Sequence, residues 1–510
     1  MRKNILFITS CLLATTTFAE NINTLPKDTT KVIDIEEVVV IASPKETGKL
    51  RELPTAVSLL SQKDMQANQI TTLKNVSSLV PNFFMPDYGS RLTSAIYIRG
   101  IGSRINTPAV GLYVDNIPYI DKSAFDFNFY DIERIDILRG PQGTLYGRNT
   151  MGGLIKVHTR SPFSYQGTDV KLSYGTKSNY RSASLTHYHR WSDCFAFSAG
   201  GYYEGSDGFF RNSLNGKKVD NMEAGGGRIH AIWLPSENLK LDFTIGYDYS
   251  DEGGYPYYYT GAIDGYDKEN EKYKNYIGKI SYDQDCTYRR GLFNTGLNIE
   301  YQAQKFILSA VTGFQNLNDR MFMDQDFLPV SIYTIEQKQR LNTISEEITF
   351  KSKNNKRWQW VTGVSGFYQW LHTTGPVNFM EDGVTDMIEG NINNTFKKIH
   401  LDNPRTPEMS LDVLNNRIRV SGSFDTPVFS TALYHQSTFN DLFVKGLSVT
   451  AGLRLEYEKM SMNYFSDSNI DFDFFLKMAM PPLNIPFRNL NAAPLLEGKE
   501  KTTMYSYFPN

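Results

Sequence analysis

From about residue 166 onward, apolar and polar residues alternate along the chain with a period of two. Val170, Leu172 and Tyr174, for example, are separated by polar residues. An alternation of this kind predicts β-strands with one apolar face. Two hairpins stand out, at 229–249 and 292–314, each with a polar turn in its middle.

Further strands are predicted at 345–351, 360–368, 432–440 and 447–458. Together these segments make roughly a dozen strands of about ten residues, a length that crosses a bilayer at a tilt. Short turns alternate with long segments, as in barrels with short periplasmic turns and long external loops. A soluble β-sandwich would have shorter and more even spacing. The pattern therefore predicts a transmembrane antiparallel β-barrel.

Residues 50–160 have a different pattern of apolar and polar positions. Helical spacing runs over 61–80 and ends before Pro81, and it predicts a buried stripe of Met65, Ile70, Leu73, Val76 and Leu79. Short strands are predicted at 95–99, 111–115 and 134–138, with glycine-rich turns between them. An α+β domain of about a hundred residues is expected here.

The N-terminus has the pattern of a secretory signal over residues 1–19. Arg2 and Lys3 precede a short apolar stretch, and Thr17-Phe18-Ala19 offers a cleavage site before Glu20. Residues 20–34 are polar and without period, which predicts a flexible leader. Export across an inner membrane follows from this reading.

Composition narrows the class of protein. The 53 Lys+Arg and 55 Asp+Glu residues nearly balance, so charge gives no reason to expect nucleic acid as a partner. After the signal, the longest apolar run is Val38–Ala42, far short of the ~20 residues of a transmembrane helix. Barrel strands, which alternate, remain possible.

No pattern for catalysis or for a resident metal is present. The seven histidines form no HExxH motif, and the sequence has neither a GxSxG elbow nor a GxxxxGK[ST] phosphate loop. Beyond the signal only Cys194 and Cys286 remain, too few for a tetrathiolate site, and whether they pair is left open. We expect no enzyme, no cofactor and no metal site.

Three segments resemble TonB-dependent outer-membrane receptors in the order that this family has them. Glu37–Ala42 is similar to the TonB box, and Ile96-Tyr97-Ile98-Arg99-Gly100 to the end of the family's "IRG" strand. The run IERIDILRGPQGTLYG at 132–147, followed by Met151-Gly152-Gly153, is close to the plug signature. Asn116 replaces a glycine of the family pattern, a mild departure because Asn tolerates left-handed backbone.

The resemblance implies a leader at 20–43, a plug at 44–162 in the lumen, and a barrel from 163 to 510. It also implies energy-coupled nutrient uptake across the outer membrane of a Gram-negative bacterium. TonB is the implied partner, with outer-membrane lipid around the barrel. TonB would add a strand to the box by β-augmentation. The residues of the box are Glu37, Val38, Val39, Val40, Ile41 and Ala42.

Family members also join the plug to the barrel wall through arginine–glutamate pairs. The matching plug positions here are Arg99 and Arg139, with Glu347 and Glu456 as candidate barrel partners. Arginine suits this role because its planar fork can bond a carboxylate at two points. The alternative is that these arginines lie in surface turns.

Candidate ligand contacts fall in two segments. Tyr255, Tyr257 and Tyr258 cluster in an expected external loop, and Tyr88, Arg91 and Arg104 fall in an expected apical loop of the plug. Aromatic rings with nearby arginines suit an anionic iron chelate. Tyrosines also gather at membrane interfaces without any ligand, which is the alternative.

A ferric siderophore is the leading substrate, with haem, cobalamin or a glycan as alternatives. Glycan transporters of the starch-utilisation type carry an extra domain before the box, and a passive porin needs no plug. The chain offers roughly a dozen of the about 22 strands of such barrels. An unclosed barrel would expose unpaired backbone groups to lipid. The competing hypothesis is therefore an inactive, truncated remnant, with transport belonging to a longer parent.

Overall fold

The chain divides into two compact units, Met1–Ile41 and Ala42–Asn510. The computed structural model describes parts of the second unit: residues 45, 55–92, 94–104, 107–261, 271–353, 357–480, 483–486, 490–492 and 495–509. The expected signal peptide and the segment Glu37–Ala42 lie outside the described residues.

The N-terminal domain is built on a five-stranded sheet with the order β1-β7-β8-β5-β6. Its strands are β1 (Ala56–Ser61), β5 (Val110–Val114), β6 (Ile117–Tyr119), β7 (Ile132–Arg139) and β8 (Gly153–Thr159). β5 and β8 are parallel and the other pairs are antiparallel. Most residues of β5, β7 and β8 are buried, among them Leu112, Ile135, Ile137 and Ile155. The strands predicted at 111–115 and 134–138 are confirmed as β5 and β7.

The predicted helix at 61–80 is two short helices, α3 (Gln62–Ala67) and α4 (Leu73–Val76). The break falls at Gln69, whose φ of 54° is left-handed and cannot continue a helix. Four members of the predicted apolar stripe are buried, but Leu79 is 37% exposed because it follows the end of α4. A single periodic stripe was therefore the wrong interpretation.

Smaller elements complete this domain. A three-stranded sheet joins β2 (Phe83–Phe84), β3 (Tyr97–Ile98) and β4 (Ile101–Gly102), so the strand predicted at 95–99 is only two residues long. The 3₁₀ helix η2 (Lys122–Ala124) and the helix α5 (Gly143–Tyr146) lie on either side of β7 in sequence.

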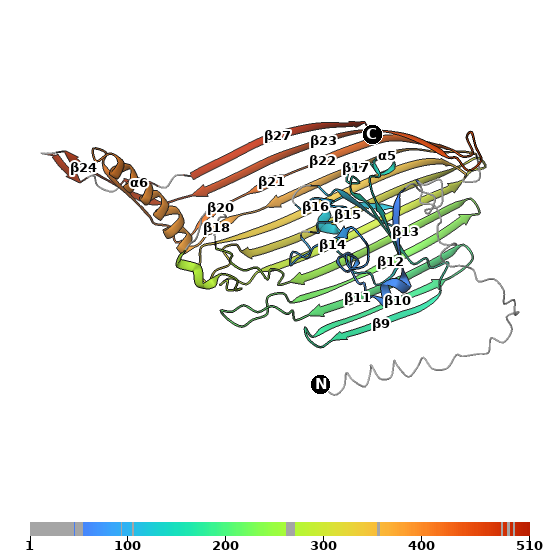
Figure 1. Ribbon diagram of the computed structural model, residues 1–510, viewed down its shortest axis with the longest axis horizontal. Helices are drawn as coiled ribbons and strands as arrows, with labels where there is room; N and C mark the ends of the chain where they lie inside the picture. Colours follow the sequence, from blue (N-terminus) through green and yellow to red (C-terminus); the bar gives the residue numbers. More distant parts are fainter. Residues whose placement is uncertain are drawn as a thin grey trace. The chain divides into compact units, whose positions relative to one another are not determined.

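The C-terminal part forms a large antiparallel sheet with fifteen strands in the described residues, drawn from β9 to β27 in Figure 1. Its long strands are β9 (Gly167–Gly175), β10 (Tyr180–Arg190), β11 (Phe195–Ser206), β12 (Met222–Ser236), β13 (Leu239–Glu252), β14 (Thr287–Gln302), β15 (Phe306–Asp324), β16 (Tyr333–Ser352), β17 (Trp358–Thr374), β22 (Val428–Phe439), β23 (Val449–Asn469) and β27 (Leu495–Pro509). The two predicted hairpins are confirmed as β12–β13 and β14–β15. Most strands are longer than predicted.

The two faces of this sheet differ in chemistry. Along β16 the buried face carries Thr343, Ser345 and Glu347, whereas Ile344 and Ile348 on the other face are 45% and 42% exposed. The alternation seen in the sequence thus corresponds to a polar buried face and an apolar exposed face. That arrangement is the reverse of a soluble sheet and matches a barrel wall.

Long connections lie at one end of the strands. The loop after β13 contains η3 (Glu271–Tyr276), and the loop after β17 contains η4 (Gly383–Glu389) and α6 (Gly390–Asp402). That second loop also holds the short strands β18 (Val377–Phe379), β19 (Glu408–Val413), β20 (Ile418–Val420) and β21 (Ser423–Asp425). β19 pairs with β24 (Phe472–Met480), which also pairs with β25 (Leu483–Pro486) and β26 (Leu490–Ala492). No helix in the described part of the chain has the length and apolar character to cross a membrane.

The N-terminal domain packs on the buried face of the large sheet. Its apolar core extends to Leu292, Leu317 and Leu341 of β14, β15 and β16. Ile117 of β6 lies so close to Gly313 that a Cβ there would stand 2.7 Å from the Ile117 Cγ2 atom. Gly313 therefore allows β6 to lie this close to β15, because a side chain at this position would meet Ile117.

Candidate functional site

Lys45 lies at the junction of the N-terminal domain and the large sheet. Its Nζ atom is 2.7 Å from Oε2 of Glu347 on β16. The same atom stands 4.4 Å from the ring centroid of Tyr146 and 5.1 Å from that of Tyr113. Burial, and then the Glu347 carboxylate, raises the pKa of the Tyr113 phenol, so this ring stays neutral at physiological pH.

A second set of charges surrounds this contact. Arg454 of β23 bonds Glu456 through its Nε atom at 2.8 Å, and Ser430 of β22 donates to the same carboxylate at 3.1 Å. Arg148, just after α5, pairs with Glu458. Charged groups of the domain and of the wall therefore meet in one place.

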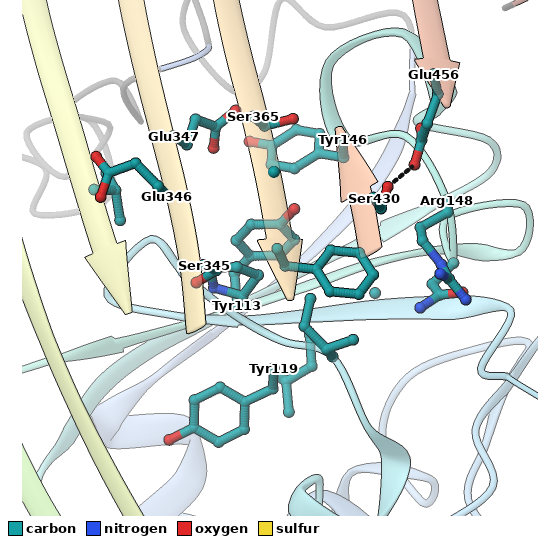
Figure 2. Close-up of a pocket in the computed structure, with 18 of the residues that line it drawn as sticks. Tyr113, Tyr119, Tyr146, Arg148, Ser345, Glu346, Glu347, Ser365, Ser430 and Glu456 are labelled. Carbon is teal, nitrogen blue, oxygen red and sulfur yellow. Dashed lines mark hydrogen bonds between the residues drawn. The ribbon is translucent and has the colours of Figure 1, made fainter. Parts of the chain in front are cut away.

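Figure 2 shows Glu347 near Tyr146, and Glu456 joined to Ser430 by a hydrogen bond. The cavity that these side chains line measures only about 70 Å³. Pockets for small molecules usually span about 300–1,000 Å³. This region is therefore a joint between two parts of the protein rather than a ligand pocket.

A second junction lies at the other end of the domain. Arg91 bonds Glu252, at the end of β13, with a distance of 2.9 Å between Nε and Oε1. Lys74 of α4 lies 2.9 Å from Oδ2 of Asp126. Burial alone would lower the pKa of Lys74, but Asp126 and Asp87 outweigh it and raise that pKa, so the ammonium stays charged.

Near the Arg91–Glu252 pair, expected ligand residues from two segments that are distant in the sequence lie close together. The Arg104 guanidinium stacks 4.6 Å above the Tyr88 ring, and the Tyr257 hydroxyl donates to the Tyr88 carbonyl at 2.7 Å. Tyr255 shares a 2.8 Å hydrogen bond with Ser90. We call Tyr88, Arg104 and Tyr257 the apical patch.

The other expected ligand residues differ in exposure. Tyr258 is 51% exposed, whereas Arg91 is 4% exposed and held by Glu252. The hydroxyls of Tyr255 and Tyr257 are engaged in tethering the loop after β13 to the N-terminal domain. Arg91 and Tyr255 therefore have structural partners, and Arg104 and Tyr258 face outward.

A larger cavity adjoins the apical patch. It has a volume of about 740 Å³, within the range of small-molecule pockets. Its lining comes from α4, from the segment around Gly89, and from the strands β9 to β13 with their loops. The charged side chains on its wall are Lys74, Arg91, Asp87, Asp126, Glu204, Asp220 and Glu252.

The arginine–glutamate pairs expected from the resemblance have other partners. Arg139 donates to the Pro81 carbonyl at 3.1 Å, inside the N-terminal domain. Arg99 is exposed in the β3–β4 turn, and its Nη1 atom lies 3.7 Å from the ideal Cβ position of Gly140 in the same domain. Glu347 instead bonds Lys45, and Glu456 bonds Arg454. In the structure both glutamates lie at the junction, and their ion-pair partners are basic residues other than Arg99 and Arg139.

Sequence reasoning missed Lys45, Tyr113, Tyr434 and Arg454. Tyr113 lies in the strand predicted at 111–115 and Tyr146 in the plug signature at 132–147, so both could have been singled out. Tyr434 and Arg454 are ordinary inward positions of alternating strands, and only the strand register brings them to the joint.

The described residues contain no group of three or more His, Cys, Asp or Glu side chains placed to hold a metal ion. Cys194 is exposed and Cys286 is buried, and both are free thiols, which settles the pairing left open by the sequence.

Comparison with known proteins gives a family match for the N-terminal domain. Residues 49–154 match the model of the TonB-dependent Receptor Plug Domain. The pesticin receptor of Yersinia pestis is 28% identical over 151 residues, which are 29% of this chain and 22% of that protein. The vitamin B12 transporter BtuB of Vibrio vulnificus is 24% identical over 282 residues, or 53% of this chain and 43% of that protein. This chain therefore spans less than half the length of these curated relatives.

Solved structures agree on the fold. The ferric yersiniabactin uptake receptor FyuA from Yersinia pestis superposes with a TM-score of 0.60 at 16% identity, covering 89% of this chain and 61% of that one. The siderophore receptor PiuA from Acinetobacter baumannii gives 0.56 at 11% identity, with coverages of 92% and 64%. At such identities the likeness concerns the fold alone. Residues 49–154 therefore match a plug domain of the TonB-dependent receptor type, and the fold of the described residues, a plug followed by a barrel-type antiparallel sheet, is that of the receptor structures named above.

Proposed function

We propose that this chain supplies the plug and barrel strands of an outer-membrane receptor that takes up a ferric siderophore by TonB-dependent displacement of the plug. In this proposal residues 1–19 are a signal peptide, 20–43 a leader with the TonB box, 44–162 the plug and 163–510 barrel wall. The observation that carries it is a family-matched plug packed on the polar face of a long antiparallel sheet.

Placement in a membrane is supported by the outer face of the sheet. On β9, Val170, Leu172 and Tyr174 are 61%, 76% and 69% exposed. Exposed apolar side chains on successive outward positions are costly in water and favourable against lipid. The outer membrane is where the family's receptors act.

A siderophore as substrate is supported by the names of the relatives. They include the pesticin receptor and a ferrioxamine B receptor of Salmonella typhimurium, 27% identical over 172 residues. The apical patch fits such a ligand, because Arg104 offers an exposed cation on the face of Tyr88, and Tyr257 is hydrogen-bonded to the Tyr88 carbonyl. Charge-assisted bonds to chelate oxygens and stacking on aromatic rings would act together.

The test is ligand binding by the purified receptor. Ferric hydroxamates, ferric catecholates and ferric phenolates are titrated, and quenching of the protein's fluorescence is followed. We expect one class of ferric chelate to bind, and Arg104→Ala to weaken that binding about tenfold, equal to ~1.4 kcal/mol. Arg405→Ala, at an exposed arginine in the loop after β17, is the matched control and should leave binding unchanged.

Vitamin B12 is the second candidate, because BtuB matches over 53% of this chain. Cyanocobalamin is therefore included in the same titration. Binding of cyanocobalamin with no binding of ferric chelates would replace the siderophore assignment. Haem and glycans have no relative among the matches named here and are not favoured.

Coupling to TonB is tested separately from binding. Val39→Pro removes a backbone N–H from the box and blocks strand addition. We expect this variant to retain ligand affinity and to lose uptake into cells and cross-linking to TonB. Uptake at the wild-type rate would contradict the assignment of Glu37–Ala42 as the box.

A further inference from the structure

The site of interest is the immediate surroundings of the Lys45 ammonium. Lys45 follows the last residue of the proposed box, Ala42, by three positions. Its side chain is nevertheless buried, at 6% exposed, against Glu347 at 9%. A lysine this deep requires a partner for its charge, because an unpaired buried ammonium is very costly.

Three aromatic rings and one carboxylate supply that partner. Besides Tyr146 and Tyr113, the Tyr434 ring lies 5.8 Å from Nζ. Tyr113 and Tyr146 meet edge to face, with centroids 5.1 Å apart at 80°. Tyr434 donates its hydroxyl to Oε1 of Glu347 at 2.7 Å, so Lys45 and Tyr434 engage the two oxygens of one carboxylate.

Tyr113, Tyr146, Tyr434 and Glu347 surround the Lys45 ammonium as a cage, and they come from both parts of the protein. Tyr113 and Tyr146 belong to the plug, on β5 and α5, whereas Glu347 and Tyr434 belong to the wall, on β16 and β22. A displacement of Lys45 therefore breaks contacts to both parts at once. It also removes the cation from the face of the Tyr146 ring. Tyr146 is the last residue of α5, the helix inside the plug signature.

We propose that Tyr113, Tyr146, Tyr434 and Glu347 form a binding site for a primary ammonium whose occupant is Lys45, and that withdrawal of Lys45 is the first step by which a pull on the leader loosens the plug. This inference rests on the proposed function in one respect, the origin of the pull.

The chemistry of the cage suits a latch that holds firmly and releases abruptly. Cation–π attraction and a buried ion pair are strong only while water is excluded. Once the ammonium moves a few ångströms outward it is hydrated, and the attraction falls steeply. Lysine favours such an abrupt release, because its charge is compact and strongly hydrated and its stem is flexible.

The experiment applies force to the leader of the receptor in native outer-membrane fragments. A handle is inserted ahead of Glu36, and the lifetime of the first extension step is measured at constant force. We expect Lys45→Met to shorten that lifetime about tenfold or more, since it keeps the stem and removes the charge. Glu347→Gln should act in the same direction.

Lys63→Met is the matched control, because Lys63 is an exposed lysine of α3 in the same domain. It should leave the lifetime within about twofold, a difference of ~0.4 kcal/mol. The double exchange Lys45→Glu with Glu347→Lys puts the ammonium back in the cage from the wall side. It should recover part of the lifetime.

Hydrogen exchange without force gives a second comparison. In Lys45→Met the amides of 143–147 should exchange faster than in the wild type, while those of the distant 287–302 stay unchanged. An unaltered first step together with unaltered exchange in Lys45→Met would overturn the latch. Neither measurement needs a ligand or TonB, so a failure of the uptake proposal leaves this test intact and can be told apart from it.

Discussion

Gly147 of the plug lies directly against the guanidinium of Arg454 on β23. A Cβ built on Gly147 would stand 2.5 Å from the Arg454 Cζ atom, so the guanidinium, which Glu456 holds, would have to shift. Gly147 also has a φ of 69°, so two separate features of the structure favour glycine at this position of the plug signature. The motif glycine thus serves the contact between plug and wall as well as the turn after α5.

Replacing this glycine should therefore cost more than backbone strain alone. We expect Gly147→Ala to lower the free energy of unfolding by about 1–3 kcal/mol beyond the cost of a left-handed alanine. Gly216→Ala is the control, because Gly216 has a φ of 72° and no atom within 4 Å of its ideal Cβ position. Thermal unfolding in detergent measures both. Equal losses in the two variants would show that Arg454 makes no demand on this position.

The buried pair of Arg91 and Glu252 should be a strong contact at the apical junction. Their side chains are 5% and 6% exposed. Arg91→Met leaves a buried carboxylate without its partner, and such a change costs about 3–5 kcal/mol. The exposed pair of Lys217 and Asp285, at 64% and 60%, provides the control, and Lys217→Met should cost at most ~1 kcal/mol. Urea unfolding of both variants checks this, and similar costs would argue against a structural role for Arg91.

The loop between β15 and β16 should be more stable in mild acid. Asp326 accepts N–H bonds from Leu328, Ile332 and Tyr333, and burial raises the pKa of its carboxyl to about 6. Since the unfolded value is about 3.9, the folded loop binds the proton more tightly. Stability is therefore gained as pH falls through 6 and is fully present below about 4.

Hydrogen exchange of 325–332, corrected for intrinsic rates, measures this effect. Exchange should be slower at pH 5 than at pH 7.5, and Asp326→Asn should lose most of the difference. Asp283 and Asp324 also face Asp326. The same pH dependence in Asp326→Asn would assign the effect to those two carboxyls instead.

The two thiols should differ sharply in reactivity. Cys194 is exposed in the turn between β10 and β11. Cys286 is buried, accepts the Asp324 N–H at 3.4 Å, and burial raises its pKa to about 12. A maleimide at neutral pH should label one thiol per native chain, and Cys194→Ser should abolish the label. Mass measurement counts the labels, and two on the native protein would contradict the buried position of Cys286.

Much of the architecture followed from local pattern. The alternation around Leu172 and the hairpin turns predicted the strands, because side chains of a strand point to opposite faces whatever the partner strand is. The prediction of one continuous helix at 61–80 was wrong, because periodicity does not reveal that Gln69 takes a left-handed conformation. Strand lengths were underestimated, because strands here continue past the apolar band into polar sequence.

The sequence by itself determined the plug signature and the strand pattern, both of which depend on neighbouring residues or on a fixed period. Only the tertiary structure decided which basic residues meet Glu347 and Glu456. Arg99 is exposed in the β3–β4 turn, and Arg139 donates to the Pro81 carbonyl within the plug. Lys45 and Glu347 lie far apart in sequence, and their meeting depends on the register of β16 against its neighbours and on the seating of the plug, which no local pattern encodes.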